Sequence, residues 1–329
     1  MSPKAEKESR EGVSFSNLDQ PLFEGAEATK RDLVEYLDGV RDRILPELTD
    51  RPLSVIRVHR GEEAFMQKNV PKYTPDFVET FTMWAETSKR KVAYALCNDR
   101  RTLLWFANQR AVEYHPTLVT TADLEHPTHL VLDLDPPGDG KGGATAAFRH
   151  AAQAALLVRQ ALADVGLEGA VKTSGAKGVH VFVPVDSSTS HEEAAAATRA
   201  IAERAAALDT KLATTAFVKD EREGKVFVDS TRVGGATVVV AYSPRARPGV
   251  PVSYPVGWEG LETVKPGDFT VHTALEHLGD GDPWAEQLPA PQALPVDLVE
   301  EGRAIPIARV QAMHEGKRKK RESAASPDG

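Results

Sequence analysis

The sequence of 329 residues contains only one cysteine, Cys97, which excludes a disulfide framework and a cysteine-rich zinc site. No apolar run reaches 18 residues and the first residues are charged, so neither a membrane-spanning helix nor a secretory signal peptide is predicted. With 41% hydrophobic residues, the chain can still bury a large core. These features predict a soluble, cytoplasmic protein in a reducing compartment.

The sequence also lacks the G-x-x-x-x-G-K-[ST] motif of a P-loop and the Lys-x-Asp-Gly motif of a ligase nucleophile. Its net charge of −8 argues against a protein that coats DNA by bulk attraction. Residues 51–60 and 88–101 are nevertheless rich in Lys and Arg, and the run "GKRKKRE" near the end of the chain is strongly basic. An acidic chain can therefore still carry a basic groove, the alternative being a solvated surface of mixed charge.

Hydrophobic patterns divide the chain into expected helices and strands. Helices are expected over 28–48, with Thr29 as N-cap, over 144–166, and over 190–209, with Ser190 and Glu193 as a capping box. Strands are expected over 53–60, 91–97, 129–135, 170–173, 179–185, 225–231 and 236–245. This mixture predicts an α+β fold with mixed or antiparallel sheets flanked by helices. Residues 1–13 are expected to be a disordered leader and residues 307–329 a flexible basic tail.

The stretch "HLVLDLDPP" places two aspartates, Asp133 and Asp135, in an apolar strand that ends on prolines. Alternate residues share one face of a strand and lie about 6.6 Å apart, where two carboxylates repel by roughly 2.5 kcal/mol. Mg²⁺ or Mn²⁺ would convert that repulsion into binding, because both prefer oxygen ligands. A D-x-D pattern alone is a weak indication, and an exposed acidic strand explains it equally well.

A third carboxylate, Asp229, ends the apolar strand "KVFVD", and we expect it also to lie at a sheet rim. Three such carboxylates suit phosphoryl transfer with two metal ions. Between the acidic strands, "KTSGAKGVHV" forms a glycine turn that offers Ser174, Lys177 and His180 to a phosphate. Taken singly, each feature also fits an ordinary hairpin or strand cap.

Together these motifs resemble the archaeo-eukaryotic primase superfamily, and most closely the polymerase domain of the bacterial end-joining ligase D and its stand-alone relatives. The resemblance runs from about residue 15 to residue 261. It includes "SNLDQPLF", "TKRDLVEYL", "RPLSVIRV", "FMQKNVP", "EYHP" and "YSPRARPGVPVS". It implies an RRM-like primase-polymerase core, with a catalytic domain over 14–306. Within that domain, a DNA-binding and 5′-phosphate-binding part would cover about 14–110 and the catalytic core about 111–306.

The resemblance also implies residue roles. The catalytic metal ligands would be Asp133, Asp135 and Asp229, holding two ions of Mn²⁺ or Mg²⁺. The nucleoside triphosphate would be held by His115, Ser174, Lys177, His180, Arg222 and Arg245. DNA or its 5′-phosphate would be contacted by Asn17, Lys30, Phe65 and Lys68. Without the family, His115 could cap a turn, Arg222 could be solvated, and Phe65, like Phe106, could lie in the core.

Two departures from the family pattern stand out. Gln20 replaces a lysine that is usual in the 5′-phosphate pocket, which predicts weaker recognition of that phosphate. After Asp229 the chain reads Ser-Thr-Arg-Val, where the family has an aromatic residue and then Gln-Asn, so Arg232 brings a charge to that position.

The resemblance therefore predicts a template-dependent nucleotidyltransferase that stands alone and adds nucleotides, preferentially ribonucleotides, to a primer 3′-hydroxyl. Its substrates would be short gaps or broken ends of DNA. Its partners would be a Ku-type end-binding protein and a separate DNA ligase, and it would act in the cytoplasm, at the nucleoid. A catalytically idle module that binds DNA ends is one alternative. A D-x-D glycosyltransferase is another, although it would have no use for Asp229 or for the glycine turn.

Overall fold

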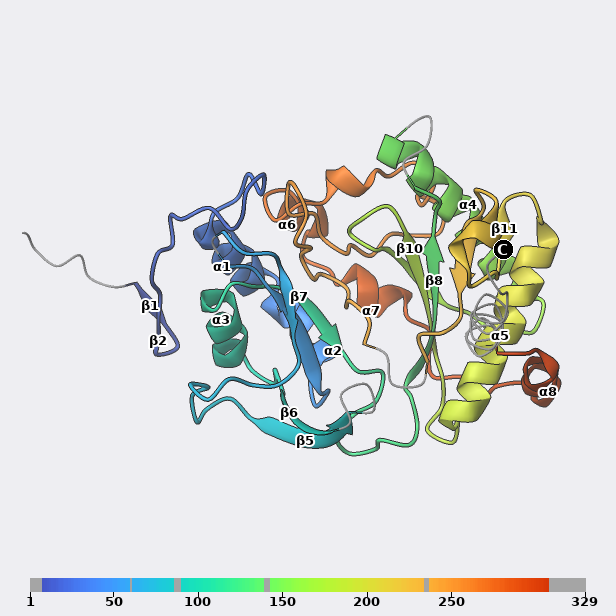
Figure 1. Cartoon of the computed structure of the whole chain (residues 1–329), viewed down its shortest axis with the longest axis horizontal. Helices are drawn as coiled ribbons and strands as arrows, with labels where there is room; N and C mark the ends of the chain where they lie inside the picture. Colours follow the sequence, from blue (N-terminus) through green and yellow to red (C-terminus); the bar gives the residue numbers. More distant parts are fainter. Residues whose placement is uncertain (1–7, 60, 86–89, 139–142, 234–236, 308–329) are drawn as a thin grey trace, which may run out of the picture.

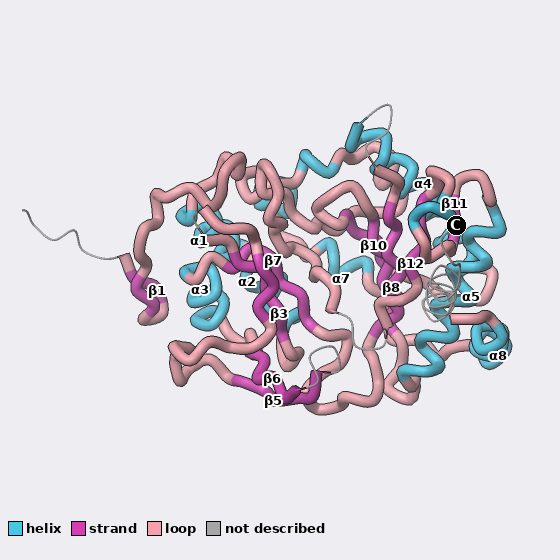
Figure 2. The backbone as a smooth tube through the Cα atoms, viewed as in Figure 1, coloured by secondary structure: helices cyan, strands magenta, loops and turns pink. Residues whose placement is uncertain are grey.

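The computed structural model describes residues 8–59, 61–85, 90–138, 143–233 and 237–307 and places them around two separate β-sheets. The N-terminal sheet lies on the left in Figure 1 and the C-terminal sheet on the right, and Figure 2 shows their strands as two groups. One continuous hydrophobic core connects both halves. No helix among the described residues is long and apolar enough to cross a membrane.

The C-terminal sheet has the strand order β11-β12-β8-β10-β9. Its strands are β8 (His129–Asp135), β9 (Ala170–Thr173), β10 (Val179–Pro184), β11 (Ala213–Thr214) and β12 (Val226–Asp229). Helix α4 (Gly143–Ala163) follows β8, and α5 (His191–Leu208) follows β10. Apart from β11, this is the βαββαβ arrangement of ferredoxin-like and RRM domains, so the expected α+β class with an RRM-like core is confirmed.

Helices α4 and α5 cover the face of this sheet that is turned away from the N-terminal half (Figure 1). Both helices are rich in alanine, which allows close packing between them. Helix α8 (Val296–Ala304) packs on α5 so closely that a Cβ atom on Gly302 would lie 1.9 Å from the Ala196 carbonyl oxygen. The opposite face of the sheet is left for the polar side chains described below.

The N-terminal sheet contains β3 (Leu53–Arg57), β4 (Phe65–Gln67), β5 (Thr80–Ala85), β6 (Arg90–Ala95) and β7 (Ala111–Pro116). Its order is β4-β3-β6-β5, and β7 also pairs with β3. Helix α3 (Arg100–Asn108) packs on β7, and α1 (Lys30–Gly39) and α2 (Arg41–Leu48) pack on α3. The predicted N-cap Thr29 and the predicted capping box of Ser190 and Glu193 are both present, since these signals depend only on neighbouring residues, and Thr29 also forms a capping box with Asp32.

An irregular segment, residues 237–256, joins the two sheets. Its first part lies along β7, where the Val238 and Val240 amides donate to the Pro116 and Tyr114 carbonyls. It then turns and its second part reaches β9, where the Thr173 amide donates to the Tyr254 carbonyl. The strand predicted over 236–245 is therefore wrong. Tyr242 adopts a left-handed conformation with φ of 67°, which stops a strand and turns the chain toward β9.

Three other expectations need correction. The helix predicted over 28–48 is broken at Val40 into α1 and α2. The boundary near residue 110 does not separate the halves, because β7 (111–116) belongs to the N-terminal sheet. Residues 8–13 are not a disordered leader, because β1 (Ser9–Arg10) pairs with β2 (Val13–Ser14). Residues 1–7 and 308–329, which include nearly all of the expected tail, lie outside the described residues.

The remaining short elements lie after α5. They are the 3-10 helices η1 (Lys219–Arg222) and η2 (Pro266–Asp268) and the helices α6 (Ala274–Leu278) and α7 (Pro283–Gln287).

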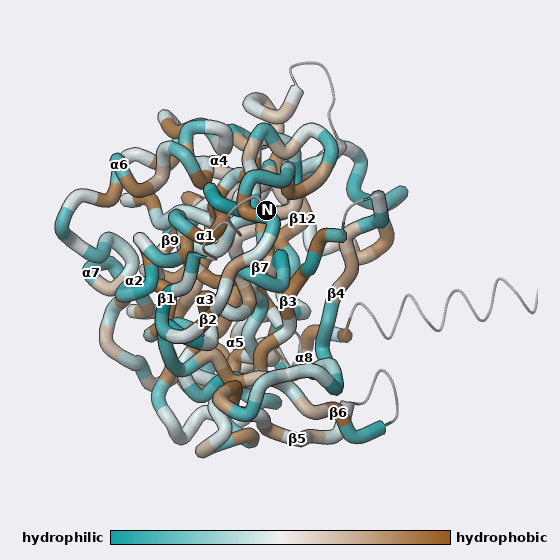
Figure 3. The backbone as a smooth tube through the Cα atoms, turned by 90° about the vertical axis from the view of Figure 1, so that its left-hand side faces the viewer, coloured by the Kyte–Doolittle hydropathy of each residue, from teal (hydrophilic) through white to brown (hydrophobic). Residues whose placement is uncertain are grey.

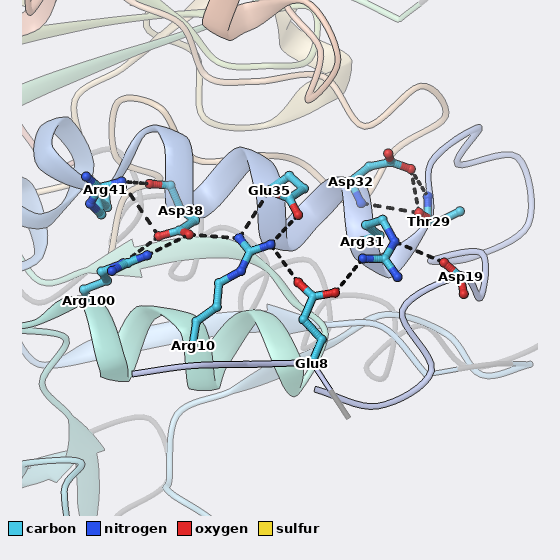
Figure 4. A network of polar contacts seen from close by, with 10 residues as sticks. All are labelled: Glu8, Arg10, Asp19, Thr29, Arg31, Asp32, Glu35, Asp38, Arg41 and Arg100. Atoms are coloured by element: carbon cyan, nitrogen blue, oxygen red, sulfur yellow. Dashed lines mark hydrogen bonds and ion pairs between the residues drawn. The ribbon is translucent and has the colours of Figure 1, made fainter. Parts of the chain in front are cut away.

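An ionic network anchors the N-terminal hairpin to α1 and α3 (Figure 4). The Arg10 guanidinium donates to Glu8 at 2.8 Å and to Asp38 at 2.9 Å, and it also contacts Glu35. Arg100 of α3 reaches the same Asp38 at 2.8 Å. Arg100 and Arg10 hold the pKa of Asp38 below its ordinary value. In the view onto this end of the molecule, β1 and β2 lie in front of α1 and α3 (Figure 3).

We expect the variant Arg10→Gln to open this hairpin locally without unfolding the protein. The Phe15 amide, which donates to the Glu8 carbonyl at 2.8 Å, should lose protection from hydrogen exchange by about five- to tenfold. The control is Arg41→Gln, because Arg41 contacts Asp38 but not the hairpin. Equal protection in both variants would show that the network does not anchor β1 and β2.

Candidate active site

Four polar side chains form a row across the C-terminal sheet, each on a neighbouring strand. The strand register places Lys172 of β9 beside His180 of β10, His180 beside Asp133 of β8, and Asp133 beside Asp229 of β12. All four are buried. Because β8 and β12 are antiparallel, Asp229 lies opposite Asp133 rather than at the rim beside Asp135. The sequence-based expectation of a shared rim is therefore wrong, and the three carboxylates meet on one face of the sheet instead.

The carboxylates of Asp133, Asp135 and Asp229 are close enough to hold a metal ion together. One oxygen from each lies within 4.8 Å of the other two. Loss of hydration and the neighbouring Asp133 charge raise the pKa of Asp135 to about 6. Since Asp135 is exposed as a whole residue, we regard the like charge of Asp133 as the decisive cause. A divalent cation would remove this repulsion, so the residues fit a Mg²⁺ or Mn²⁺ site.

Hydrogen bonds along the row orient Asp133. The buried Lys172 Nζ lies 2.9 Å from His180 Nδ1 and donates to Ser253 Oγ at 2.6 Å. His180 Nε2 lies 3.3 Å from Asp133 Oδ1. Burial and the neighbouring Lys172 lower the pKa of His180 to about 4, so its ring is neutral at pH 7. In that state Nδ1 accepts from Lys172 and Nε2–H points at Asp133, which fixes both the tautomer and the carboxylate.

Arg232 lies between two of the carboxylates. One of its terminal nitrogens is 2.6 Å from Asp133 Oδ2 and 3.1 Å from Asp229 Oδ2. The other Asp229 oxygen accepts from the Thr231 amide at 2.8 Å and from the Thr231 hydroxyl at 2.6 Å. Burial alone would raise the pKa of Asp133, but His180 and Arg232 bring it well below its ordinary value. Because His180 is neutral at pH 7, Arg232 supplies the charge that keeps Asp133 ionised.

The glycine turn between β9 and β10 folds tightly against its neighbours. Ser174 Oγ accepts from the amides of Ala176 and Gly178, at 3.2 and 3.1 Å. Gly175 has φ of +67°, and a Cβ atom there would lie 2.6 Å from the Arg245 side chain. A Cβ atom on Gly178 would lie 2.7 Å from the Leu134 carbonyl oxygen. The two glycines are therefore required by close packing, and Lys177 is half-buried at the tip.

A buried carboxylate, Glu113 of β7, links two of the predicted nucleotide ligands. It lies 2.8 Å from His115 Nε2 and 2.9 Å from Arg245 Nε, and it accepts from the Ala246 amide at 2.9 Å. Arg245 also donates to the Ser174 carbonyl oxygen, so it joins β7 to the glycine turn. Burial alone would raise the pKa of Glu113, but its partners His115 and Arg245 lower it to about 2. Burial lowers the pKa of His115, whose ring is therefore neutral at pH 7, which leaves Arg245 as the compensating charge.

Arg222 of η1 packs against Phe227 of β12. Its guanidinium lies 3.8 Å from the centroid of the Phe227 ring and donates to the carbonyls of Ala216 and Phe217. Phe227 is the strand partner of Asp135. Arg222 therefore lies near Asp135, whereas His115, Arg245 and Ser174 are connected to one another through Glu113.

The predicted DNA contacts lie apart from the carboxylates, in the N-terminal half. Lys30 is buried and donates to the Ser16 carbonyl at 2.7 Å and to Asn108 at 2.6 Å. Asn17 is exposed, and its carbonyl accepts from the Gln20 amide at 3.2 Å. Burial and the nearby Arg110 lower the pKa of Lys30 to about 8. The arrangement brings Asn17, Gln20 and Lys30 together, with Arg110 as an additional cation.

Phe65 of β4 is exposed rather than in the core, with 38% of its surface accessible, and it stacks on His59 with ring centroids 5.2 Å apart. Lys68 follows it and is half-buried. Phe106, in contrast, is fully buried in α3. An exposed aromatic ring beside a cation is a suitable platform for an unpaired base.

Sequence reasoning missed Glu113, Lys172 and Ser253. Lys172 lies in the strand predicted over 170–173, where its alternation with apolar residues also fits a solvated strand face. No strand was predicted around Glu113, which the structure places in β7. Residues 237–256 contact both side chains: Ser253 accepts from Lys172, and Arg245 and the Ala246 amide contact Glu113.

Comparisons with known proteins agree with this geometry. Residues 29–284 match the family model described as "LigD, primase-polymerase domain". The "Bifunctional non-homologous end joining protein LigD" of Bacillus subtilis is 31% identical over 293 residues, covering 87% of this chain and 46% of that protein. The "Multifunctional non-homologous end joining protein LigD" of Mycobacterium bovis is 31% identical over 286 residues, covering 83% of this chain and 37% of that protein. The chain thus spans less than half the length of these relatives.

A solved structure is also similar. The polymerase domain from Mycobacterium tuberculosis ligase D, in complex with DNA, superimposes with a TM-score of 0.74 at 29% identity, covering 84% of this chain and 97% of that domain. The family match covers β3 to β12, and with them the three aspartates and the glycine turn. On these grounds the chain belongs to the LigD primase-polymerase domain family, whose members are nucleotidyltransferases of the polymerase type.

Proposed function

We propose that this protein adds nucleotides to the 3′-hydroxyl of a primer at short gaps or DNA ends, under the direction of a template. The observation that carries the proposal is the cluster of three carboxylates on one face of the sheet, beside the glycine turn and the linked pair His115 and Arg245. The names of the relatives support end joining as the setting. The DNA bound to the similar mycobacterial domain supports DNA as the partner.

In this proposal, the triphosphate is bound by cationic side chains, a hydroxyl group and two neutral imidazole rings. These groups are Lys177, Arg222, Arg245, Ser174, His180 and His115. Arg245 is held by Glu113, so its charge is fixed before the nucleotide arrives, and a preorganised cation stabilises the developing charge without reorganisation. The primer hydroxyl attacks the α-phosphate, and pyrophosphate leaves. Divalent cations held by Asp133, Asp135 and Asp229 would activate that hydroxyl and neutralise the pyrophosphate.

The DNA side of the proposal rests on two places in the N-terminal half. Lys30, Asn17 and Arg110 would receive the 5′-phosphate of a downstream strand, although Gln20 reduces the charge available there. Phe65 and Lys68 would support an unpaired template base. A preference for ribonucleotides and for Mn²⁺, joint action with a Ku-type protein and a separate ligase, and work at the nucleoid belong to the same proposal.

Extension of a primer on gapped DNA tests this function. The assay would compare the four ribonucleotides with the four deoxyribonucleotides, in Mn²⁺ and in Mg²⁺, on gaps with and without a downstream 5′-phosphate. We expect addition of the templated nucleotide, faster with ribonucleotides and only modestly stimulated by the 5′-phosphate. If the folded protein bound gapped DNA but added no nucleotide under any of these conditions, it would be the idle end-binding module.

A further inference from the structure

Arg232 occupies the position between Asp133 and Asp229 that a bridging cation would need. A single guanidinium nitrogen contacts an oxygen of each aspartate, at 2.6 and 3.1 Å. A divalent cation of the proposed kind binds carboxylate oxygens at about 2.1 Å. The nitrogen and the ion cannot both approach the same two oxygens, because the distance left between them would be far below their contact distance.

The guanidinium is held at this position by charge more than by a complete set of hydrogen bonds. Among the described residues, Arg232 Nε is buried and has no hydrogen-bond partner. The side chain is nevertheless 33% accessible, so it has a path out of the site. An arginine with one unsatisfied donor and one open side can be displaced at lower cost than a fully bonded one.

The surrounding residues explain why the site needs a resident cation. Asp133 and Asp229 are buried and lie directly opposite each other on paired strands. Lys172 does not reach the aspartates, because the His180 ring lies between Lys172 Nζ and Asp133. Two buried carboxylates that face each other are costly without a compensating charge, and Arg232 provides it.

We propose that Arg232 is an internal competitor of the divalent cation: it neutralises Asp133 and Asp229 in the metal-free protein and must leave these oxygens before the cation binds. The inference rests on the proposed function for the identity of the cation. It goes beyond that function in assigning to one residue of this chain the task of setting how tightly the metal binds.

The test is Mn²⁺ binding in the absence of nucleotide and DNA, followed by the electron paramagnetic resonance signal of the free ion. The variant Arg232→Gln should bind Mn²⁺ at least about tenfold more tightly than the wild type, the order of effect that one adjacent charge has on a carboxylate. Arg232→Lys, which keeps the charge but cannot form the same planar contact, should fall between the two. Arg204→Gln is the control, because it removes one arginine charge from an exposed pair with Glu301.

Thermal unfolding provides an independent readout. Without metal, Arg232→Gln should melt at a lower temperature than the wild type, and Mn²⁺ should raise its melting temperature by more than it raises that of the wild type. If Mn²⁺ affinity were the same in wild type and Arg232→Gln, while Asp135→Asn weakened it, the inference would be wrong and the metal site would stand. If none of these variants altered Mn²⁺ binding, the proposed function would fail as well.

Discussion

Replacing Asp135 by asparagine is expected to abolish nucleotide addition and, at the same time, to stabilise the metal-free protein. The carboxylate is one of three whose oxygens lie within 4.8 Å of one another. Metal-ion catalysis contributes several kcal/mol of transition-state stabilisation, so the single-turnover rate should fall about a thousandfold or more. Asparagine cannot take a negative charge, and the repulsion between positions 133 and 135 disappears.

The pH dependence distinguishes this explanation from a simple packing effect. The pKa of Asp135 is about 6 in the folded protein and about 3.8 in the unfolded chain, so the wild type gains stability from protonation at low pH. That gain is complete below about pH 3.8 and is lost as the pH rises through about 6. The melting temperature of Asp135→Asn should therefore exceed that of the wild type only toward and above pH 6.

The control for this prediction is Asp164→Asn, because Asp164 is exposed and its side chain accepts a hydrogen bond from Gln160 of α4. It should change neither the rate nor the pH dependence of melting. If folded Asp135→Asn were fully active, or melted at a lower temperature than the wild type at pH 7, Asp135 would not have the role assigned to it in the site.

The second large effect is expected for Glu113→Gln, which keeps the shape of the side chain and removes its charge. Glu113 is buried, and it holds both His115 and Arg245. Breaking a buried ion pair by removing one partner leaves the other charge uncompensated, at a cost of roughly 3 kcal/mol. We expect a loss of that size in the free energy of unfolding at pH 7. The KM for the nucleotide should also rise at least tenfold, because Arg245 is no longer fixed.

The lowered pKa of Glu113 also predicts how the loss of stability in Glu113→Gln changes with pH. The pKa of Glu113 is lowered from 4.5 to about 2, so the wild-type carboxylate contributes stability above about pH 4.5 and loses it as the pH falls toward 2. The difference in the free energy of unfolding between wild type and Glu113→Gln should therefore become smaller below pH 4.5. Glu301→Gln is the matched control, because Glu301 pairs with Arg204 at an exposed site and such pairs contribute at most about 1 kcal/mol. Equal losses for Glu113→Gln and Glu301→Gln would contradict the linking role of Glu113.

The parts of the site that sequence could predict are those set by neighbours in the chain. The alternation in "HLVLDLD" is sufficient to place Asp133 and Asp135 on one face of β8, and the glycines at 175 and 178 are sufficient for a turn. The position of Asp229 was predicted less well. Its strand was correct, but the antiparallel pairing of β12 with β8 moves it from the rim to a place opposite Asp133. Pairing direction depends on the whole sheet, so no local pattern contains it.

The features of the site that could not be predicted depend on contacts between segments that are distant in the sequence. His115 lies on β7, which pairs with β3 more than 50 residues earlier in the chain, and it reaches the C-terminal half only through Glu113 and Arg245. In the sequence, Lys172 resembles a solvated strand residue. In the structure, residues 237–256 cover it, and Ser253 Oγ accepts a hydrogen bond from Lys172 Nζ. The first part of this segment falls within the strand predicted over 236–245, and the left-handed Tyr242 shows why it is not one.

The most direct test of the central claim is the position of Mn²⁺ in a crystal grown with a nonhydrolysable nucleoside triphosphate. The anomalous signal of manganese locates the ions without reference to activity. We predict two peaks, about 3.5–4 Å apart, whose ligands are oxygens of Asp133, Asp135 and Asp229 and of the triphosphate, with Arg232 displaced from Asp133. A bound nucleotide with no manganese peak at these three aspartates would contradict the account.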